Sequence, residues 1–308
     1  MNNYKDILDY ALNLLEHDQP FSAMHYLEEA MYKLKHVSSP EEWNHQCRLC
    51  RKHRIANYLY QDPFTKWSYD KPRGYPGDAV LMDYIYQHHS VQQYIDEATP
   101  LGKKLYQYSI NTPATRAVRY RLIYVANLID DLADKLGAID VLSLACGHVR
   151  ETEISNAMKL GKLKRFIALD QDEKTVATVS SLYSGKIQAK VISARELITG
   201  KFDWFGSGFD LIYSVGLIDY LEDRVSQNLI KRLFAMLNPC GYLFIPNFKP
   251  SIIDSGYMEA FMDWKLIYRD NDDMRNLAEL LPIQEIDKID TSSSDPDNNI
   301  VLMLIKKK

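Results

Sequence analysis

Two segments of the sequence carry residues that could bind a nucleoside. VLSLACGHVRE, residues 141–151, runs from an apolar stretch into a loop with a single glycine, Gly147, and then into a helix start. The free N–H groups at a helix start bind oxygen ligands. RFIALDQD follows and carries Asp170, roughly twenty residues beyond the glycine, where an acid can hold the hydroxyl pair of a ribose. Together, the loop and the acid predict a nucleotide or nucleoside site.

The loop lacks the glycines that a dinucleotide requires. In the G-x-G-x-x-G pattern, the further glycines let a pyrophosphate approach the backbone. Here Ala145 and Val149 stand at those positions. A ligand with an adenosine but no pyrophosphate needs less room, and S-adenosylmethionine is such a ligand. The sequence therefore favours S-adenosylmethionine as the cofactor.

The elements that must position these residues alternate in kind. After Gly137, short apolar stretches alternate with helical ones, and the last two stretches, LPIQEIDKID and NNIVLMLIKK, are joined by the polar loop SSSDPD. This order predicts a doubly wound α/β domain of seven strands, in which the final hairpin makes the last strand antiparallel. Ligands of such sheets bind outside the carboxyl ends of the strands. We therefore expect Gly147 and Asp170 to meet there.

The first part of the chain is expected to be helical. Apolar residues recur at helical spacing in residues 4–17 and 21–37, and Ser39 caps a third helix that we expect to continue to residue 60. Further helices are expected over residues 79–89 and from Pro113 to a stop at Gly137. The expected domains are a helical lid or substrate domain, residues 1–137, and a cofactor-binding domain, residues 138–308.

KPRGYPGD, residues 71–78, interrupts the helices with turn residues. As a structural turn, it would pair Arg73 with Asp78 in a surface ion bridge of little worth. As a functional segment, it would be a lid in which Arg73 or Tyr75 meets the cofactor or the substrate, while Asp78 begins a helix. We favour the functional interpretation.

Composition and cysteine use limit the partners. Lys and Arg total 37 against 41 Asp and Glu, so no basic excess points to nucleic acid. No apolar run approaches the ~20 residues of a membrane span. Four cysteines and no export signal indicate a reducing cytoplasm. HQCRLCRKH, with Cys47 and Cys50, could suggest zinc, but structural zinc usually takes ligands from two separate segments. We expect a cytoplasmic monomer or homodimer that binds a small molecule and no metal.

The motif order resembles that of the class I S-adenosylmethionine-dependent methyltransferases. FDLIYSVGLIDYL is similar to the family's fourth motif, and NPCGYLFI to its turn and fifth strand. Ser143 stands where the first motif usually has an acid, so Arg150 or Glu151 could help to hold the amino-acid end of the cofactor. The resemblance implies a Rossmann-like sheet. The implied cofactor-binding residues are Arg73, Ser143, Ala145, Cys146, Gly147, Arg150, Asp170, Gln171, Ala194, Arg195 and Ser214. The implied catalytic or orienting residues are Tyr75, Asn111, Tyr213, Ser214 and Asp219.

Longer stretches resemble one bacterial subgroup of this family. KPRGYPGDAVLMDYIY, VLSLACGHVRE, ALDQD, GLIDYLEDR and YMEAFMDWKLIYRD together are similar to methyltransferases that make 3-hydroxy fatty acid methyl esters as cell-density signals. They are also similar to enzymes that cyclise S-adenosylmethionine to azetidine-2-carboxylate. Either resemblance implies bacterial secondary metabolism. In the last stretch, Trp264, Tyr268 and Arg269 would either line the acceptor site or belong to the core.

The implied chemistry is an in-line displacement at a sulfonium, in which the enzyme mainly positions and desolvates. A carboxylate acceptor needs no general base, whereas a hydroxyl or an amine does. His148 is the only histidine after Gly137, which favours a carboxylate or an amine that deprotonates easily. Cyclisation would need a neutral amine on the cofactor and a nearby tyrosine or acid to take its proton. A binding protein without turnover is the third hypothesis.

Overall fold

The computed structural model describes residues 4–200, 206–292 and 294–308. Ser293 of the expected polar loop lies outside these residues. The chain divides into two compact units. A helical unit comprises the residues up to Val118 together with Ser251–Lys265, and an α/β unit comprises Arg119–Pro250 and Leu266–Lys308. The roles expected for two domains stay predictions.

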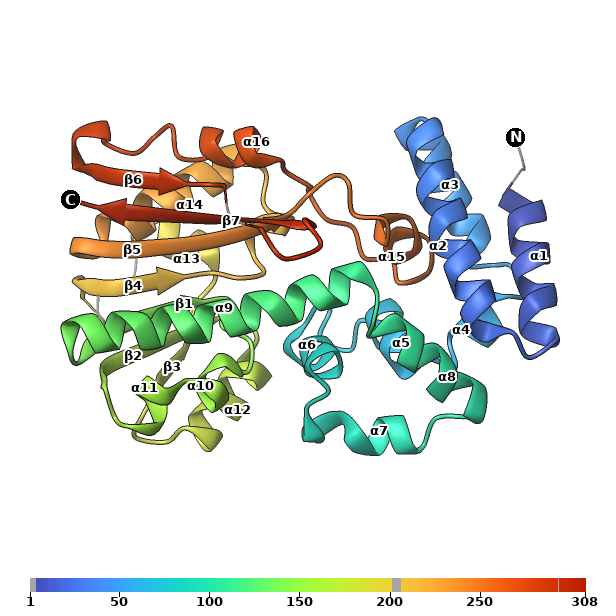
Figure 1. The fold of residues 1–308 in the computed structure, drawn as a ribbon, viewed down its shortest axis with the longest axis horizontal. Helices are drawn as coiled ribbons and strands as arrows, with labels where there is room; N and C mark the ends of the chain where they lie inside the picture. The colour runs from blue at the N-terminus through green and yellow to red at the C-terminus, as the bar shows by residue number, and fades with distance from the viewer. Residues whose placement is uncertain (1–3, 201–205, 293) are drawn as a thin grey trace. The chain divides into compact units, whose positions relative to one another are not determined.

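The helical unit is built from short amphipathic helices (Figure 1). Ser39 forms a capping box with Glu42, as its position predicts. The expected continuation of this helix to residue 60 is wrong, because the Ile55 N–H bonds the His53 ring and a turn follows Cys50. The helices are α1 (Tyr4–Glu16), α2 (Pro20–Val37), α3 (Pro40–Cys50), α4 (Ala56–Leu59), α5 (Pro63–Asp70), α6 (Ala79–Tyr86), η1 (His89–Val91), α7 (Gln92–Asp96), α8 (Pro100–Ser109), the first turns of α9 (Pro113–Leu136), and α15 (Ser255–Phe261).

Helix α15 joins this unit from far along the sequence. A Cβ on Gly256 would lie 2.4 Å from the carbonyl carbon of Met31 in α2, so only glycine allows this approach. Trp43 of α3 donates its indole N–H to the Glu259 carboxylate at 2.7 Å. Residues 251–265 therefore pack with helices that precede them by two hundred positions and more.

The α/β unit is a seven-stranded sheet with the order β3-β2-β1-β4-β5-β7-β6. Strand β7 runs antiparallel to both of its neighbours, so the predicted α/β sheet with an antiparallel last strand is confirmed. The strands are β1 (Ile139–Leu144), β2 (Leu163–Asp170), β3 (Gln188–Val191), β4 (Phe209–Tyr213), β5 (Leu237–Phe248), β6 (Ile286–Asp290) and β7 (Ile300–Lys307). The helices are the rest of α9, α10 (Glu151–Ile154), α11 (Asn156–Lys159), α12 (Glu173–Leu182), α13 (Ala194–Ile198), η2 (Ile218–Tyr220), α14 (Asp223–Ala235), α16 (Asn271–Asn276) and η3 (Ile283–Glu285).

Apolar side chains fix the sheet against its helices. Leu142, Ile212 and Leu243 of three neighbouring strands pack with Leu229 and Leu233 of α14, and all are fully buried. Each such side chain contributes roughly 1.5–3 kcal/mol. The core therefore holds β1, β4 and β5 in register, and the loops that follow these strands start from fixed points.

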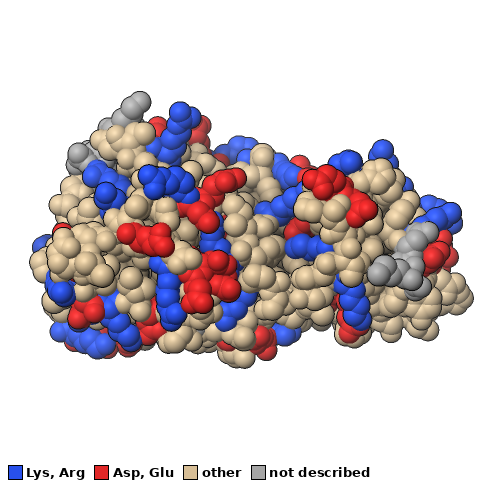
Figure 2. All heavy atoms as spheres, turned by 90° about the horizontal axis from the view of Figure 1, so that it is seen from above, with Lys and Arg blue, Asp and Glu red and all other residues tan. Residues whose placement is uncertain are grey.

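The surface carries charges of both signs. Figure 2 shows Lys and Arg interspersed with Asp and Glu on the face seen from above. Within the described ranges, every helix falls short of the length or apolarity that crossing a membrane demands.

Candidate functional site

The loop after β1 has a strained backbone. Ala145, Gly147 and Val149 have φ angles of +50°, +53° and +48°. A left-handed conformation costs an L-residue roughly 1–2 kcal/mol, and it is rarer still for a β-branched residue. Ala145 and Val149 thus have the backbone that glycine favours. Strain of this kind persists only where the surrounding structure holds the backbone in place, and it is concentrated at ligand sites.

Asp170 lies beside this loop, as the sequence predicts. Its carboxylate accepts hydrogen bonds from the backbone N–H groups of Gly147 and Asp172, each at 3.0 Å. Burial raises the pKa of this carboxyl, and the two N–H groups oppose that effect. A carboxylate accepts up to about four hydrogen bonds, so Asp170 keeps capacity for hydroxyl donors such as those of a ribose.

A second polar cluster lies beneath the same loop. Ser143 of β1 and Tyr213 of β4 are neighbours in the parallel register. The Tyr213 hydroxyl donates to the carboxylate of Glu151, the first residue of α10. All three side chains are buried. Burial raises the pKa of Glu151 to about 7 and raises the pKa of the Tyr213 phenol. An acid that titrates near neutral pH therefore lies directly after the loop.

Arg150, which precedes Glu151 in the chain, forms an ion pair. Its guanidinium donates to the Glu153 carboxylate at 2.6 Å, and its side chain is buried. Cys146 has a buried thiol whose pKa burial raises. The Cys146 N–H donates to the carbonyl of Leu169 at 3.1 Å, which ties the loop to the end of β2.

The end of β4 adds Ser214 and Asp219. The backbone N–H of Ser214 donates to Phe244, while its buried hydroxyl has no hydrogen-bond partner among the described residues. Asp219 accepts the Phe248 N–H at its carboxylate, at 2.9 Å, and the Ile267 N–H at its carbonyl, at 2.7 Å. Asp219 is thus held by two other segments of the unit.

Arg121 of α9 lies near Asp219, and the sequence analysis does not single it out. Its side chain is buried, and its charge opposes the rise that burial causes in the pKa of Asp219. Its guanidinium carbon lies 5.7 Å from the ring centroid of Phe248. An arginine within a long amphipathic helix gives no sequence signal of such a place.

The remaining predicted residues of the α/β unit lie at strand ends. Gln171 directly follows β2 and is exposed. Ala194 and Arg195 begin α13, and Ser193 forms a capping box with Glu196. Residues 193–195 therefore form a helix start that follows β3.

Arg73, Tyr75 and Asn111 lie in the helical unit. Arg73 and Tyr75 are partly exposed, and the exposed Asn111 donates to the Gln107 carbonyl at 2.8 Å. Asp78 begins α6 as predicted, accepting the Leu81 N–H at 2.8 Å and the Trp67 indole N–H at 2.9 Å. A common site that unites these residues with Asp170 stays a prediction.

The cysteines of HQCRLCRKH are packing residues in the helical unit. Cys47 and Cys50 are buried, and burial raises the pKa of each thiol to about 12. Within the described part of the chain, no group of His, Cys, Asp and Glu side chains is arranged to hold a metal ion. Trp264 is buried in the helical unit, and Arg269 is buried in the α/β unit.

Comparison with known proteins finds matches in structure alone. No protein-family model matches the sequence, and no curated protein matches it. A possible exported protein from Bordetella parapertussis shares the fold with a TM-score of 0.55 at 14% identity, over 88% of this chain and 99% of that chain. The N-methyltransferase NodS from Bradyrhizobium japonicum, in complex with S-adenosyl-L-homocysteine, has a TM-score of 0.42 at 16% identity, over 73% and 99% of the two chains. Magnesium protoporphyrin IX methyltransferase from Synechocystis, with bound S-adenosylmethionine, has a TM-score of 0.43 at 11% identity, over 74% and 96%. At these identities, the likeness concerns the fold alone.

Proposed function

We propose that the chain is an S-adenosylmethionine-dependent enzyme that acts on a small molecule. The observation that carries the proposal is the contact between Asp170 and Gly147 at the carboxyl edge of the sheet. This contact places an acid with spare acceptor capacity beside a strained loop and a helix start, which suits a nucleoside with a charged tail.

The residues present fit this cofactor. Asp170 would accept the ribose hydroxyls, and the loop at Gly147 would let the ligand approach the backbone. The buried Ser214 hydroxyl lacks a partner among the described residues and suits a polar group of the ligand. The proposed binding residues of the α/β unit are Ser143, Ala145, Cys146, Gly147, Arg150, Asp170, Gln171, Ala194, Arg195 and Ser214, and Arg73 would contribute from the helical unit.

Methyl transfer to a carboxylate or another small acceptor, such as a hydroxy fatty acid, is the reaction that we favour. When bound, S-adenosylmethionine supplies an activated methyl group on a sulfonium. The chain then has to orient the acceptor and exclude water. Tyr213 and Asp219 would orient the acceptor from the α/β unit, and Tyr75 and Asn111 from the helical unit. A carboxylate acceptor requires no base, which agrees with the scarcity of histidine near the strand ends.

Cyclisation of the cofactor to azetidine-2-carboxylate is the second candidate. The Glu151 carboxyl favours it, because an acid whose pKa burial raises to about 7 can take a proton from an ammonium group near neutral pH. Tyr213 would hold that carboxyl in place through its hydroxyl. We propose a cytoplasmic location under both candidates.

One experiment separates these functions. The purified chain is incubated with S-adenosylmethionine, first alone and then with carboxylate and hydroxy fatty acid acceptors, and the adenosine products are identified by mass spectrometry. S-adenosylhomocysteine that forms only with an acceptor supports methyl transfer. Methylthioadenosine and azetidine-2-carboxylate from the cofactor alone support cyclisation instead. Saturable binding without product identifies a binding protein, and the absence of binding overturns the whole proposal.

A further inference from the structure

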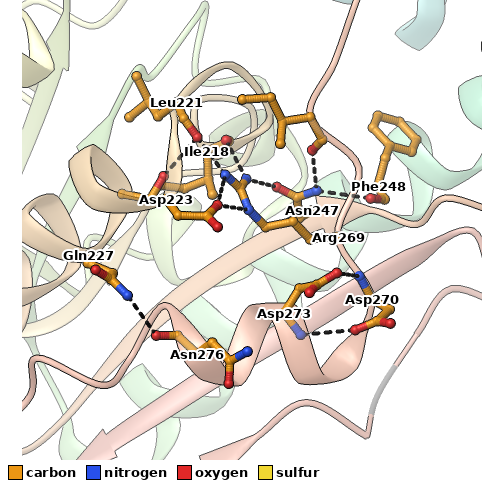
Figure 3. A network of polar contacts seen from close by, with 12 residues as sticks. Ile218, Leu221, Asp223, Gln227, Asn247, Phe248, Arg269, Asp270, Asp273 and Asn276 are labelled. Carbon is orange, nitrogen blue, oxygen red and sulfur yellow. Dashed lines mark hydrogen bonds and ion pairs between the residues drawn. The ribbon is translucent and has the colours of Figure 1, made fainter. Parts of the chain in front are cut away.

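Arg269 is a buried arginine of the α/β unit whose guanidinium uses all of its hydrogen-bond donors. Its side chain is 2% exposed. The guanidinium makes five hydrogen bonds, which equals the number of its N–H donors. Figure 3 shows them converging from several directions on one side chain. The acceptors are the Asp223 carboxylate at 3.0 and 2.8 Å, the Ile218 carbonyl at 2.9 Å, the Leu221 carbonyl at 2.6 Å and the Asn247 side-chain oxygen at 3.0 Å.

Two of these acceptors bracket the loop after β4. Ile218 and Leu221 stand on either side of Asp219 and Tyr220. A backbone bond from the Leu221 N–H to the Ile218 carbonyl, at 3.1 Å, also closes this turn. The guanidinium reaches both carbonyls at once and thereby fixes the spacing of the two ends of the turn.

Asn247 of β5 extends the network. Its side-chain amide donates to the carbonyls of Phe248 and Ile267, each at 2.9 Å. Ile267 in turn donates its N–H to the Asp219 carbonyl, and the Arg269 N–H donates to Phe248. We call these residues, together with Ile218, Leu221 and Asp223, the Arg269 clasp. Two residues of the clasp bond to Asp219: Phe248 from β5 and Ile267 from the segment that follows residue 265.

Arg269 forms an ion pair with a solvated side chain, that of Asp223. Asp223 is 73% exposed, so its attraction to the guanidinium is screened, whereas the guanidinium itself is desolvated. An apolar side chain would fill the same space without that desolvation cost. However, an apolar side chain could not form hydrogen bonds to four separate residues and thereby fix their arrangement.

We propose that Arg269 is a positioning residue, which holds the turn Ile218–Leu221 in the one conformation in which Asp219 orients the acceptor. This inference rests on the proposed function. Lysine cannot replace arginine here, because an ammonium group has three donors and no planar fork.

The test compares Arg269→Lys, Arg269→Gln and Asp223→Asn with Arg275→Gln. Arg275 is the matched control, because it lies six positions further on and pairs with Asp272 on the surface. For each variant we would measure melting temperature, affinity for S-adenosylmethionine, kcat and KM, and amide hydrogen exchange in residues 216–222. The last readout requires no activity.

Arg269→Lys is expected to stay folded and to bind the cofactor like the wild type, since Asp170 and Gly147 belong to other loops. Its kcat should fall on the order of ten- to hundredfold, as expected for a small misplacement of reacting groups. Amide exchange should rise in residues 216–222 and not in β1 or β2. Arg269→Gln should lose more, and Asp223→Asn less, because Asn still accepts hydrogen bonds.

Two results would overturn the proposal. Unchanged exchange in residues 216–222 of Arg269→Lys would mean that the guanidinium does not hold the turn. Parallel losses of melting temperature, cofactor affinity and kcat in Arg269→Lys and Asp223→Asn would mean that Arg269 only stabilises the fold. If the wild type shows no turnover with any acceptor, the proposed function fails, and the exchange data still decide whether Arg269 holds the turn.

Discussion

The hydroxyl of Tyr213 donates a hydrogen bond to the carboxylate of Glu151, and both side chains are buried. The two residues are 62 positions apart and belong to the ends of β4 and of the loop after β1. Ser143 lies beside Tyr213 in the sheet. The candidate site therefore has a buried carboxyl, which the first residue of α10 supplies.

Glu151→Gln should change how stability depends on pH. Burial raises the pKa of Glu151 from 4.5 to about 7, so between these values the native state binds a proton that the unfolded state has released. The stabilisation is therefore fully present below pH 4.5 and is lost as the pH rises through 7. Glutamine does not titrate. As the pH rises from 4.5 to 8, the free energy of unfolding should therefore fall by on the order of 3 kcal/mol less in the variant than in the wild type. Urea unfolding followed by far-UV circular dichroism from pH 4.5 to 8 measures the difference.

Glu153→Gln is the control for this measurement, because Glu153 is partly exposed and pairs with Arg150. Its profile should run parallel to that of the wild type over the same range. Identical slopes for Glu151→Gln and the wild type would show that Glu151 is ionised in the native state throughout.

Asp170→Asn should weaken cofactor binding and leave the fold intact. The amide oxygen can still accept the Gly147 N–H, but the charge and one acceptor oxygen are lost. Hydrogen bonds to a charged group are worth ~1.5–3 kcal/mol, so the Kd for S-adenosylmethionine should rise by roughly 10- to 100-fold. Isothermal titration calorimetry measures it. Asp140→Asn is the matched control, because Asp140 lies near the opposite end of β1 and bonds Arg165. Equal affinities for the two variants would contradict the role given to Asp170.

Ala145→Gly should stabilise the α/β unit. Alanine at φ +50° costs roughly 1–2 kcal/mol, and glycine removes that cost while adding ~0.5–1 kcal/mol of unfolded-state entropy. The net gain is up to about 1.5 kcal/mol, which calorimetry would record as a rise in melting temperature of a few degrees. Val149→Gly should have the opposite sign, because Val149 is buried and its loss leaves a cavity. A fall in melting temperature for Ala145→Gly would mean that the methyl group contributes packing that exceeds the strain.

Local pattern was sufficient to predict the sheet. Each strand is a short apolar run bounded by turn residues. Gly137 has a φ of +84° and ends α9, and after it the sequence changes from helical spacing to alternating strands and helices. The neighbourhood of Gly147 and Asp170 followed from the same argument, because carboxyl ends of parallel strands share one edge.

Features that depend on long-range packing were not predictable. The close approach of Gly256 to Met31 joins residues that are far apart in the chain. Arg269 makes five hydrogen bonds to four acceptor residues, and only the folded chain brings these residues together. The break after Cys50 depends on a hydrogen bond from the Ile55 N–H to the His53 ring, which competes with a helix that the apolar spacing favours.

The helical unit contains a buried acid pair with its own pH dependence. Glu28 of α2 accepts the Tyr108 hydroxyl at 2.7 Å, and Asp254, directly before α15, accepts the Ala114 N–H. Burial raises the pKa of Glu28 to about 8 and that of Asp254 to about 6, and the nearby Asp254 charge adds to the rise at Glu28. Between pH 4.5 and 8, the native state therefore holds protons that the unfolded state releases, and stability falls as the pH rises.

Glu28→Gln should make that decline shallower. The variant removes one titrating group from the pair. The difference in the free energy of unfolding between the wild type and the variant should therefore shrink as the pH rises from 5 to 8. Tryptophan fluorescence during urea unfolding is the suitable probe, because three of the four tryptophans, Trp43, Trp67 and Trp264, belong to the helical unit. Glu29→Gln is the control. Glu29 is the adjacent residue but is exposed, and its bond with Lys33 lowers its pKa. A deficit of Glu28→Gln that stays constant from pH 5 to 8 would show that Glu28 does not carry a proton in the native unit.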